Sequence, residues 1–251
     1  MSRGRGLARH LVRLALLVLL AAAALQLGFA LRIAAMAVID PASTAFQRSE
    51  AWRLLVHKGR IEWSQSWVDY EAISVHLKRA VIASEDASFV DHAGIDWEAV
   101  ERAWERNQSA QARAERRTAT PGAGPAGTPP PVGGSTISQQ LAKNLFLSGE
   151  RTVLRKAQEF VITALLEVIL SKRRMLEIYL NHVEWGEGVF GAQAAARHYY
   201  RVDAQRLGPE AAARLAVMLP APKRFEKRPG SPYVAGRAAT IQARMGGVRI
   251  P

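Results

Sequence analysis

The sequence of 251 residues contains no cysteine. This absence excludes disulfide bonds, thiolate metal sites and cysteine nucleophiles. Strand signals are also sparse, and no internal repeat occurs. Apolar residues nevertheless make up 49% of the chain, which is enough to close a hydrophobic core. We therefore expect a folded, mainly α-helical protein rather than a disordered chain.

Basic residues outnumber acidic residues. The chain has 34 Lys and Arg against 22 Asp and Glu, a formal charge of +12, which favours an anionic partner such as nucleic acid, anionic lipid or a phosphorylated substrate. The six histidines are scattered and form no His-x-x-x-His pair beside acids. We therefore predict no metal site.

The N-terminal segment has the composition of a membrane anchor. Four arginines precede an apolar run of eighteen residues, Leu14 to Leu31, in which Gln26 is the only polar residue. As a helix this run spans about 27 Å, close to the hydrocarbon thickness of a bilayer. We predict a cytoplasmic basic tail over residues 1–13, a transmembrane helix over 14–39, and a domain outside the membrane over 40–251.

Two other interpretations compete with the anchor. A cleaved signal peptide also joins a basic start to an apolar run, but this run is long for a signal peptide, and Ala21–Ala24 offers only weak cleavage candidates. A buried core helix is the second alternative, and the basic flank argues against it.

Beyond the anchor, the chain alternates helical patterns with one long irregular stretch. Apolar residues recur at helical spacing over 71–83, 97–106, 135–145, 151–181 with a break near Ser171, 192–200 and 209–219. Residues 107–132 are rich in Ala, Arg, Gln and Glu and then in Pro and Gly. Because nothing there can bury an apolar face, we predict a flexible loop. Ser135 is predicted to cap the helix that follows it.

The end of the 71–83 helix has a candidate general base. Glu85 and Asp86 are adjacent and are followed by Phe89, His92 and Gly94. Neighbouring carboxylates raise each other's pKa, which helps one of them accept a proton near neutral pH. Taken alone, such a pair is more often a solvated helix end, and a single histidine is more often a structural hydrogen-bonding group.

Two further segments are suited to anion binding. Gly133 and Gly134 before a Ser-capped helix would expose free backbone N–H groups, to which Lys143 and Arg151 could add positive charge. An ordinary glycine turn explains the same residues.

Arg155, Lys156 and Glu159 share one face of the following helix. They form either a surface ion-pair ladder or a cationic grip on a pyrophosphate. Their spacing alone is compatible with both.

Together, these segments resemble the signature motifs of peptidoglycan glycosyltransferases, the family that polymerises lipid II. Five motifs occur in the family's order across residues 85–222: Glu85-Asp86-x-x-Phe89-x-x-His92-x-Gly94, Gly133-Gly-Ser-Thr-Ile-x-Gln-Gln-Leu-Ala-Lys-Asn144, Arg155-Lys156-x-x-Glu159, Tyr179-Leu-Asn181 with Ala195-Ala196-x-x-Tyr199-Tyr200, and Leu215-Ala-x-x-Leu-Pro220-x-Pro222. The chain is most similar to the monofunctional biosynthetic transglycosylases, which have a single anchor. It lacks the Ser-x-x-Lys and Lys-Thr-Gly motifs of a transpeptidase domain.

The resemblance implies a lysozyme-like helical domain with its cleft held against the bacterial inner membrane, on the periplasmic side. The donor would be glycan on undecaprenyl pyrophosphate, and the acceptor would be lipid II. Glu85 would be the general base, and Glu159 would orient the cations or help to protonate the leaving group. The resemblance also implies residues that bind the substrate, by stabilising the pyrophosphate, lining the cleft or shaping the surroundings of the base: Lys143, Arg151, Arg155, Lys156, Ser135, Gln139, Gln140, Asp86, Phe89 and His92.

The same resemblance implies no required cofactor, although a divalent cation, Mg²⁺ or Mn²⁺, could assist the pyrophosphate. The expected partners are the membrane, the lipid-linked substrates and other cell-wall synthesis or division proteins. Nucleic acid is excluded because the anchor places the domain on the wrong side of the membrane.

Two departures from the family pattern stand out. The stretch over 107–132 is longer than the usual link between the first two motifs, and Ser138 occupies a position where Thr is common. The longer link leaves the geometry on the acceptor side open.

Two other functions remain open. A lytic glycan-cleaving enzyme shares the lysozyme-like fold and a catalytic Glu, but it has no use for a cation-rich third motif. A non-catalytic cell-wall scaffold would not depend on Glu85.

Overall fold

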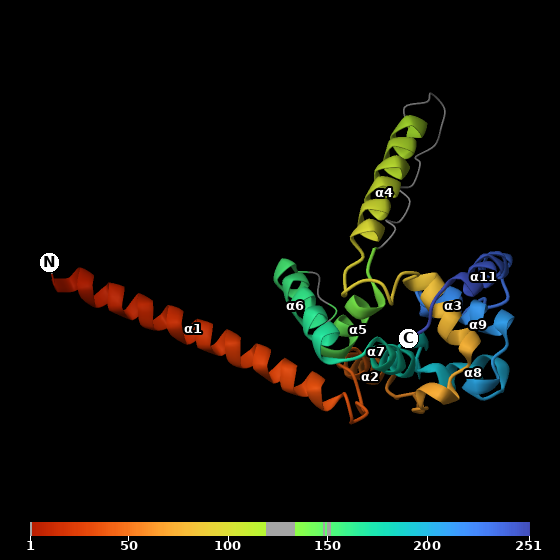
Figure 1. The fold of residues 1–251 in the computed structure, drawn as a ribbon, viewed down its shortest axis with the longest axis horizontal. Helices are drawn as coiled ribbons and strands as arrows, with labels where there is room; N and C mark the ends of the chain where they lie inside the picture. Colours follow the sequence, from red (N-terminus) through yellow and green to blue (C-terminus); the bar gives the residue numbers. More distant parts are fainter. Residues whose placement is uncertain (1, 119–133, 148, 150–151) are drawn as a thin grey trace.

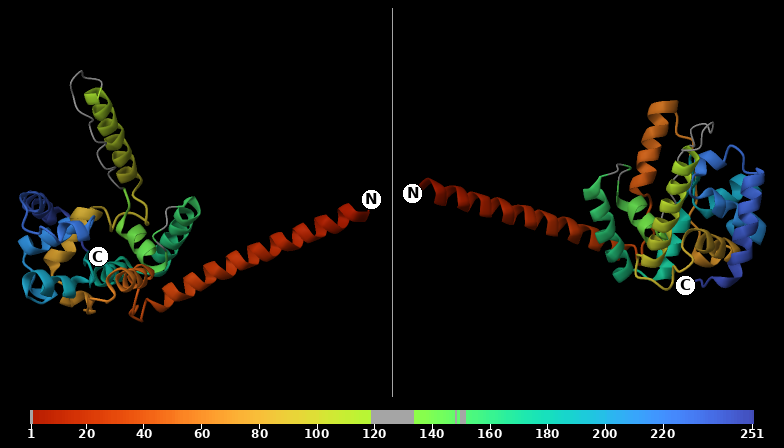
Figure 2. Two further views of the ribbon diagram at one scale, coloured as in Figure 1. Left: turned by 180° about the vertical axis from the view of Figure 1, so that it is seen from behind. Right: turned by 90° about the horizontal axis from the view of Figure 1, so that it is seen from above.

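The computed structural model describes residues 2–118, 134–147, 149 and 152–251. One long helix, α1 (Ser2–Ala35), extends away from a helical body, as all three views show (Figures 1 and 2). Its segment Arg9–Ala35 has a mean hydropathy of 2.5 and is long and apolar enough to cross a membrane. The mainly helical architecture and the N-terminal apolar helix predicted from the sequence are therefore confirmed.

Helix α1 does not have the same ends as the predicted membrane span of 14–39, whose own bounds stay a prediction. The helix already begins at Ser2, because the residues of the basic tail are themselves compatible with a helix. It ends at Ala35, four residues before the predicted end of the span. The cause is that Ile33 and Met36 are buried in the core of the body, so the chain turns into the domain at this point.

The C-terminal third of α1 is tied to the body by a polar pair. Gln26, the polar residue within the apolar run, exchanges two hydrogen bonds of 2.9 and 3.0 Å with Gln158. Phe29 packs edge-on against Phe146 nearby. The amide of Gln26 is thus satisfied by another amide, as an apolar environment requires.

The body consists of ten helices among the described residues, with short 3-10 turns and very little sheet. The helices are α2 (Ala45–Lys58), α3 (Val75–Glu85), α4 (Trp97–Thr118), α5 (Ile137–Phe146), α6 (Val153–Ile169), α7 (Lys172–His182), α8 (Ala192–Tyr200), α9 (Pro209–Met218), α10 (Pro222–Phe225) and α11 (Pro232–Arg244). The 3-10 turns are η1 (Tyr70–Ala72), η2 (Ala204–Arg206) and η3 (Met245–Gly247). Strand β3 (Val189–Phe190) lies between β1 (Ser64–Gln65), to which it is parallel, and β2 (Glu184–Gly186), to which it is antiparallel.

Two groups of helices meet in one core. Helix α3 packs against α9 and α11, and α5 packs against α6 and α7. Their buried apolar side chains, such as Ile82 on α3, Leu141 on α5 and Leu215 on α9, belong to a single hydrophobic cluster. The cluster fixes the end of α3 relative to the start of α5, where the first two sequence motifs lie.

The prediction of a flexible loop over residues 107–132 is wrong for its first part. Helix α4 continues through residues 107–118 and projects from the body in both figures. The Ala, Arg, Gln and Glu residues of this stretch are strong helix formers, so the helix persists without an apolar face to bury. Residues 119–132, the Pro- and Gly-rich part of the prediction, lie outside the described residues.

The break predicted near Ser171 is confirmed. Helix α6 ends at Ile169, and the Ser171 side chain caps α7 by accepting a hydrogen bond from the backbone N–H of Arg174. The helices predicted over 192–200 and 209–219 are also present, as α8 and α9.

Candidate active site

Glu85 is the last residue of α3 and lines a cavity of about 540 Å³. Its carboxylate accepts hydrogen bonds from the side-chain amide of Gln140, at 3.0 Å, and from the hydroxyl of Ser84, at 3.3 Å. Burial raises the pKa of Glu85 above its ordinary value, the two donors oppose this shift, and Asp86 adds slightly to it. Glu85 is therefore a carboxylate with neutral donors and an increased affinity for a proton.

The amide of Gln140 is held in one orientation. The hydroxyl of Tyr179, a buried residue on α7, donates to Gln140 Oε1 at 2.9 Å. This contact directs the NH₂ group of Gln140 toward Glu85. The sequence analysis predicted that Gln140 binds the substrate. It did not predict the contact of Tyr179, although Tyr179 is the first residue of the fourth motif.

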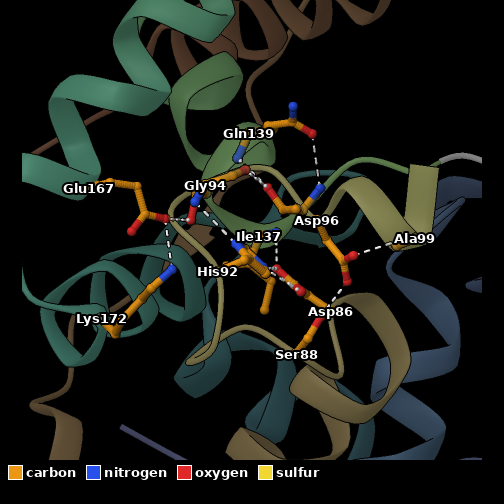
Figure 3. A network of polar contacts seen from close by, with 12 residues as sticks. Asp86, Ser88, His92, Gly94, Asp96, Ala99, Ile137, Gln139, Glu167 and Lys172 are labelled. Atoms are coloured by element: carbon orange, nitrogen blue, oxygen red, sulfur yellow. Dashed lines mark hydrogen bonds and ion pairs between the residues drawn. The ribbon is translucent and has the colours of Figure 1, made fainter. Parts of the chain in front are cut away.

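Asp86 connects three segments (Figure 3). Its buried carboxylate pairs with His92 Nε2 at 2.9 Å and accepts the backbone N–H of Ile137 at 3.0 Å. Phe89 is completely buried in the core. The contacts of Asp86, Phe89 and His92 are thus with the protein itself, and substrate binding by these three residues stays a prediction.

The N-terminus of α5 differs from the prediction. Thr136, not Ser135, is the cap: its hydroxyl accepts the N–H of Gln139, and the Gln139 side chain accepts the N–H of Thr136. The reason is that Thr136 has a Gln three residues later, as a capping box requires, and Ser135 does not.

At least three of the backbone N–H groups that the predicted anion site would use are not free. The amides of Thr136, Ile137 and Gln139 are all taken by protein acceptors, one of which is Asp86. Gly133, the first residue of that prediction, lies outside the described residues. Ser135 remains exposed and lines the cavity beside Glu85.

A second network holds α5 against α6 and α7 (Figure 3). The hydroxyl of Ser138 and the ammonium of Lys172 both donate to Glu167 Oε1. Gly94 lies beside this carboxylate with a φ of +89°, and a Cβ there would come within 2.7 Å of Thr163. Both the backbone conformation and the lack of space require glycine at this position.

Glu159 has a different environment. It is buried on α6, where Arg155 Nη1 lies 3.1 Å from its Oε2 and the ammonium of Lys156 contacts its Oε1. The three residues predicted to share one helical face therefore form ion pairs. Lys143 is exposed on α5, and Arg151 lies outside the described residues.

The surroundings of Glu85 and Lys156 adjoin. Lys156 lines a pocket of about 300 Å³ together with Trp97, Trp104 and Phe160. Both this pocket and the Glu85 cavity include Gly134 and Ser135 in their walls. A molecule bound across this short segment could reach a proton acceptor on one side and a cation on the other.

Comparison with known proteins agrees with this geometry. The sequence profile of the transglycosylase family matches residues 55–246. The chain belongs to the transglycosylase family. It is 49% identical over 250 residues to the biosynthetic peptidoglycan transglycosylases of Burkholderia thailandensis and Burkholderia pseudomallei, covering 100% of this chain and 91% of each relative. The corresponding protein of Burkholderia vietnamiensis is 48% identical over 250 residues, covering 95% of its length.

Membership in the transglycosylase family confirms the resemblance read from the five motifs. It also confirms a lysozyme-like helical fold and an enzyme that is a peptidoglycan glycosyltransferase. In this transglycosylase, no group of three or more His, Asp or Glu side chains within the described ranges has a geometry that could hold a metal ion.

Proposed function

We propose that the chain polymerises lipid II into β-1,4-linked glycan strands and releases undecaprenyl pyrophosphate. One observation carries the proposal. Glu85, a carboxylate with a raised pKa whose donors among the described residues are neutral, lines a cavity whose wall continues into the pocket of Lys156. A general base and a cation on either side of one segment suit a reaction that deprotonates an alcohol and expels a diphosphate.

In the proposed reaction, Glu85 accepts the proton of the acceptor's GlcNAc 4-hydroxyl. The oxygen attacks C1 of the donor's terminal MurNAc from the face opposite the α-linked pyrophosphate, so the new bond is β. The charge that develops on the leaving group is met by Arg155 and Lys156, whose positions Glu159 fixes through its two ion pairs. Lys143 and Arg151 complete the proposed set of cations.

The burial of Glu85 and its hydrogen-bond donors explain why it suits the role of general base. A base works best when its pKa lies near the working pH, and burial moves the pKa of Glu85 in that direction. Gln140 and Ser84 hold the carboxylate in place without neutralising it. The proposed substrate contacts of Ser135 and Gln139 rest on their places in the walls of the two hollows.

The lytic alternative and the scaffold alternative are separated from this proposal by one comparison. Purified full-length protein in detergent should convert lipid II to glycan polymer, and Glu85→Gln should not. As a matched control, Glu210→Gln changes an exposed carboxylate on α9 and should keep full activity. Release of fragments from finished cell wall would favour the lytic enzyme, and normal cellular function of Glu85→Gln would favour the scaffold.

The proposed location is the bacterial inner membrane, with the N-terminus in the cytoplasm and the domain on the periplasmic side. The basic residues before the apolar segment of α1 support this orientation. Because the chain has no cysteine, a single introduced thiol reports its own side of the membrane. A membrane-impermeant maleimide on intact spheroplasts should label Ala239→Cys and leave Ser2→Cys unlabelled; the opposite pattern would refute the orientation.

We further propose that the partners of the chain are the membrane and the lipid-linked substrates, together with other cell-wall synthesis or division proteins. The exposed apolar segment of α1, Arg9–Ala35, supports membrane contact.

A further inference from the structure

The cavity beside Glu85 is lined by arginines from two helices that are far apart in the sequence. Arg102 and Arg106 lie on α4, and Arg237 and Arg244 lie on α11. The two residues on α11 are seven positions apart, which is about two helical turns, so they share one side of the helix about 10 Å apart. Helix α11 follows the last of the five sequence motifs, so no motif points to it.

The acidic groups of the cavity are already engaged. Asp86 pairs with His92, and Asp91 pairs with Arg249. Asp96 accepts hydrogen bonds from Ser88 and from the backbone of Ala99, and it faces Arg102 at 3.8 Å. Glu85, the fourth lining carboxylate, accepts hydrogen bonds from the neutral groups of Gln140 and Ser84.

The two arginines of α11 have no such partner. Within the described residues, neither Arg237 nor Arg244 forms an ion pair, and both are exposed at the cavity. The packing of α11 does not require these arginines, because α11 is held through the buried Val234, Ala238 and Ile241 on the adjoining face. Two unpaired guanidinium groups therefore face the same hollow as the candidate base.

We propose that Arg237 and Arg244 bind an anionic group of the acceptor substrate, and so place its hydroxyl at Glu85. This inference rests on the proposed function and adds the acceptor-binding residues to it. Guanidinium groups bind carboxylates and phosphates through paired hydrogen bonds. Lipid II offers both chemistries, as the carboxylates of its peptide stem and as its pyrophosphate, and two groups spaced along α11 suit a ligand with more than one charge.

The test is steady-state kinetics of the full-length protein in detergent with lipid II. The double variant Arg237→Gln/Arg244→Gln should raise KM about tenfold or more, with a much smaller change in kcat, because the groups bind the substrate away from the reacting atoms. The salt dependence of KM should also become weaker than in the wild type. Arg237→Lys/Arg244→Lys should restore part of the affinity, since it keeps the charge and loses the paired geometry.

The control is Arg206→Gln, which removes an exposed arginine outside the cavity and should leave KM unchanged. Lipid II with amidated peptide carboxylates identifies the anion. If the carboxylates are the ligand, the KM of the wild type for the amidated substrate should be as high as the KM of the double variant for unmodified lipid II. If the pyrophosphate is the ligand, the tenfold difference in KM between the wild type and the double variant should persist with the amidated substrate.

An unchanged KM in the double variant, or an equal loss in the control, would overturn this inference while leaving the proposed function standing. A wild-type protein that does not turn over lipid II would instead refute the proposed function. Thermal unfolding of each variant checks that the fold is retained.

Discussion

Glu85 and Glu159 are both largely enclosed carboxylates, yet their partners differ in kind. Glu85 receives hydrogen bonds from the neutral groups of Gln140 and Ser84, whereas Glu159 is paired with the cations of Arg155 and Lys156. A carboxylate among neutral donors keeps its affinity for a proton, and one between two cations is held as their counter-charge. The difference supports the proposed roles, in which Glu85 transfers the proton and Glu159 orients the cations.

The largest expected effect separates these two roles. Replacing Glu85 by Gln removes the base, so kcat for lipid II polymerisation should fall about 10²–10⁴-fold without loss of the fold. Replacing Glu159 by Gln leaves Arg155 and Lys156 in place but loosens them, so its loss of kcat should be smaller.

The variants are compared by kcat and by thermal unfolding under the same conditions. An equal loss of kcat in the two variants, with both folded, would contradict the division of roles and would return Glu159 to direct participation in proton transfer.

A third buried carboxylate extends the comparison to stability. Burial raises the pKa of Glu184 to about 7, and nearby Lys223 opposes the shift. Between its ordinary pKa of 4.5 and about 7, the folded state binds a proton that the unfolded state does not, so the contribution of Glu184 to stability is lost as the pH rises through 7. Glu184→Gln should therefore be more stable than the wild type at pH 8, by roughly 3 kcal/mol, and nearly equal to it at pH 4.5.

Glu187 is the control for that measurement, because its pKa is shifted in the opposite direction. Hydrogen bonds from Lys58 and Arg53 lower the pKa of Glu187 to about 2. Its contribution is present above the ordinary pKa of 4.5 and is lost as the pH falls toward 2. Glu187→Gln should thus lower the thermal midpoint at pH 8, where Glu184→Gln raises it. Midpoints that move in the same direction for both variants would refute the assigned environments.

The role of Gln140 sharpens the account of Glu85 through the pH profile. Its amide donates to the charged form of Glu85 and so lowers the pKa of that carboxyl relative to burial alone. Gln140→Leu should move the acidic limb of kcat/KM to higher pH, because the base would then be protonated over a wider range. A profile that falls uniformly at all pH values would instead indicate a contact between Gln140 and the substrate.

The sequence was sufficient to predict the helical fold, the apolar N-terminal helix and the family, because each depends on local periodicity or on residues close together in a motif. It could not give the orientation of the side chains within the motifs. Ser135 and Thr136 are both good caps by type, and only the Gln at position 139 favours Thr136. The contact of Gln140 with Glu85 joins residues 55 positions apart, so it depends on how α3 and α5 pack.

The error over residues 107–118 has another origin. A segment without an apolar face can still be helical: α4 projects from the body and needs only residues with high helix propensity. Arg237 and Arg244 were missed because they belong to none of the five motifs and line the cavity of Glu85 only through the packing of α11 on α3.

The smallest expected effect comes from Tyr179, which contacts Glu85 only through Gln140. Its hydroxyl fixes the amide so that the NH₂ group faces the carboxylate. Tyr179→Phe keeps the buried ring and frees the amide to rotate, so the acidic limb of kcat/KM should shift in the same direction as in Gln140→Leu, but by less. In the Gln140→Leu background, Tyr179→Phe should add nothing to the shift, because the amide through which Tyr179 acts on Glu85 is already absent. An additive shift would mean that Tyr179 acts on Glu85 by a route that does not pass through the amide.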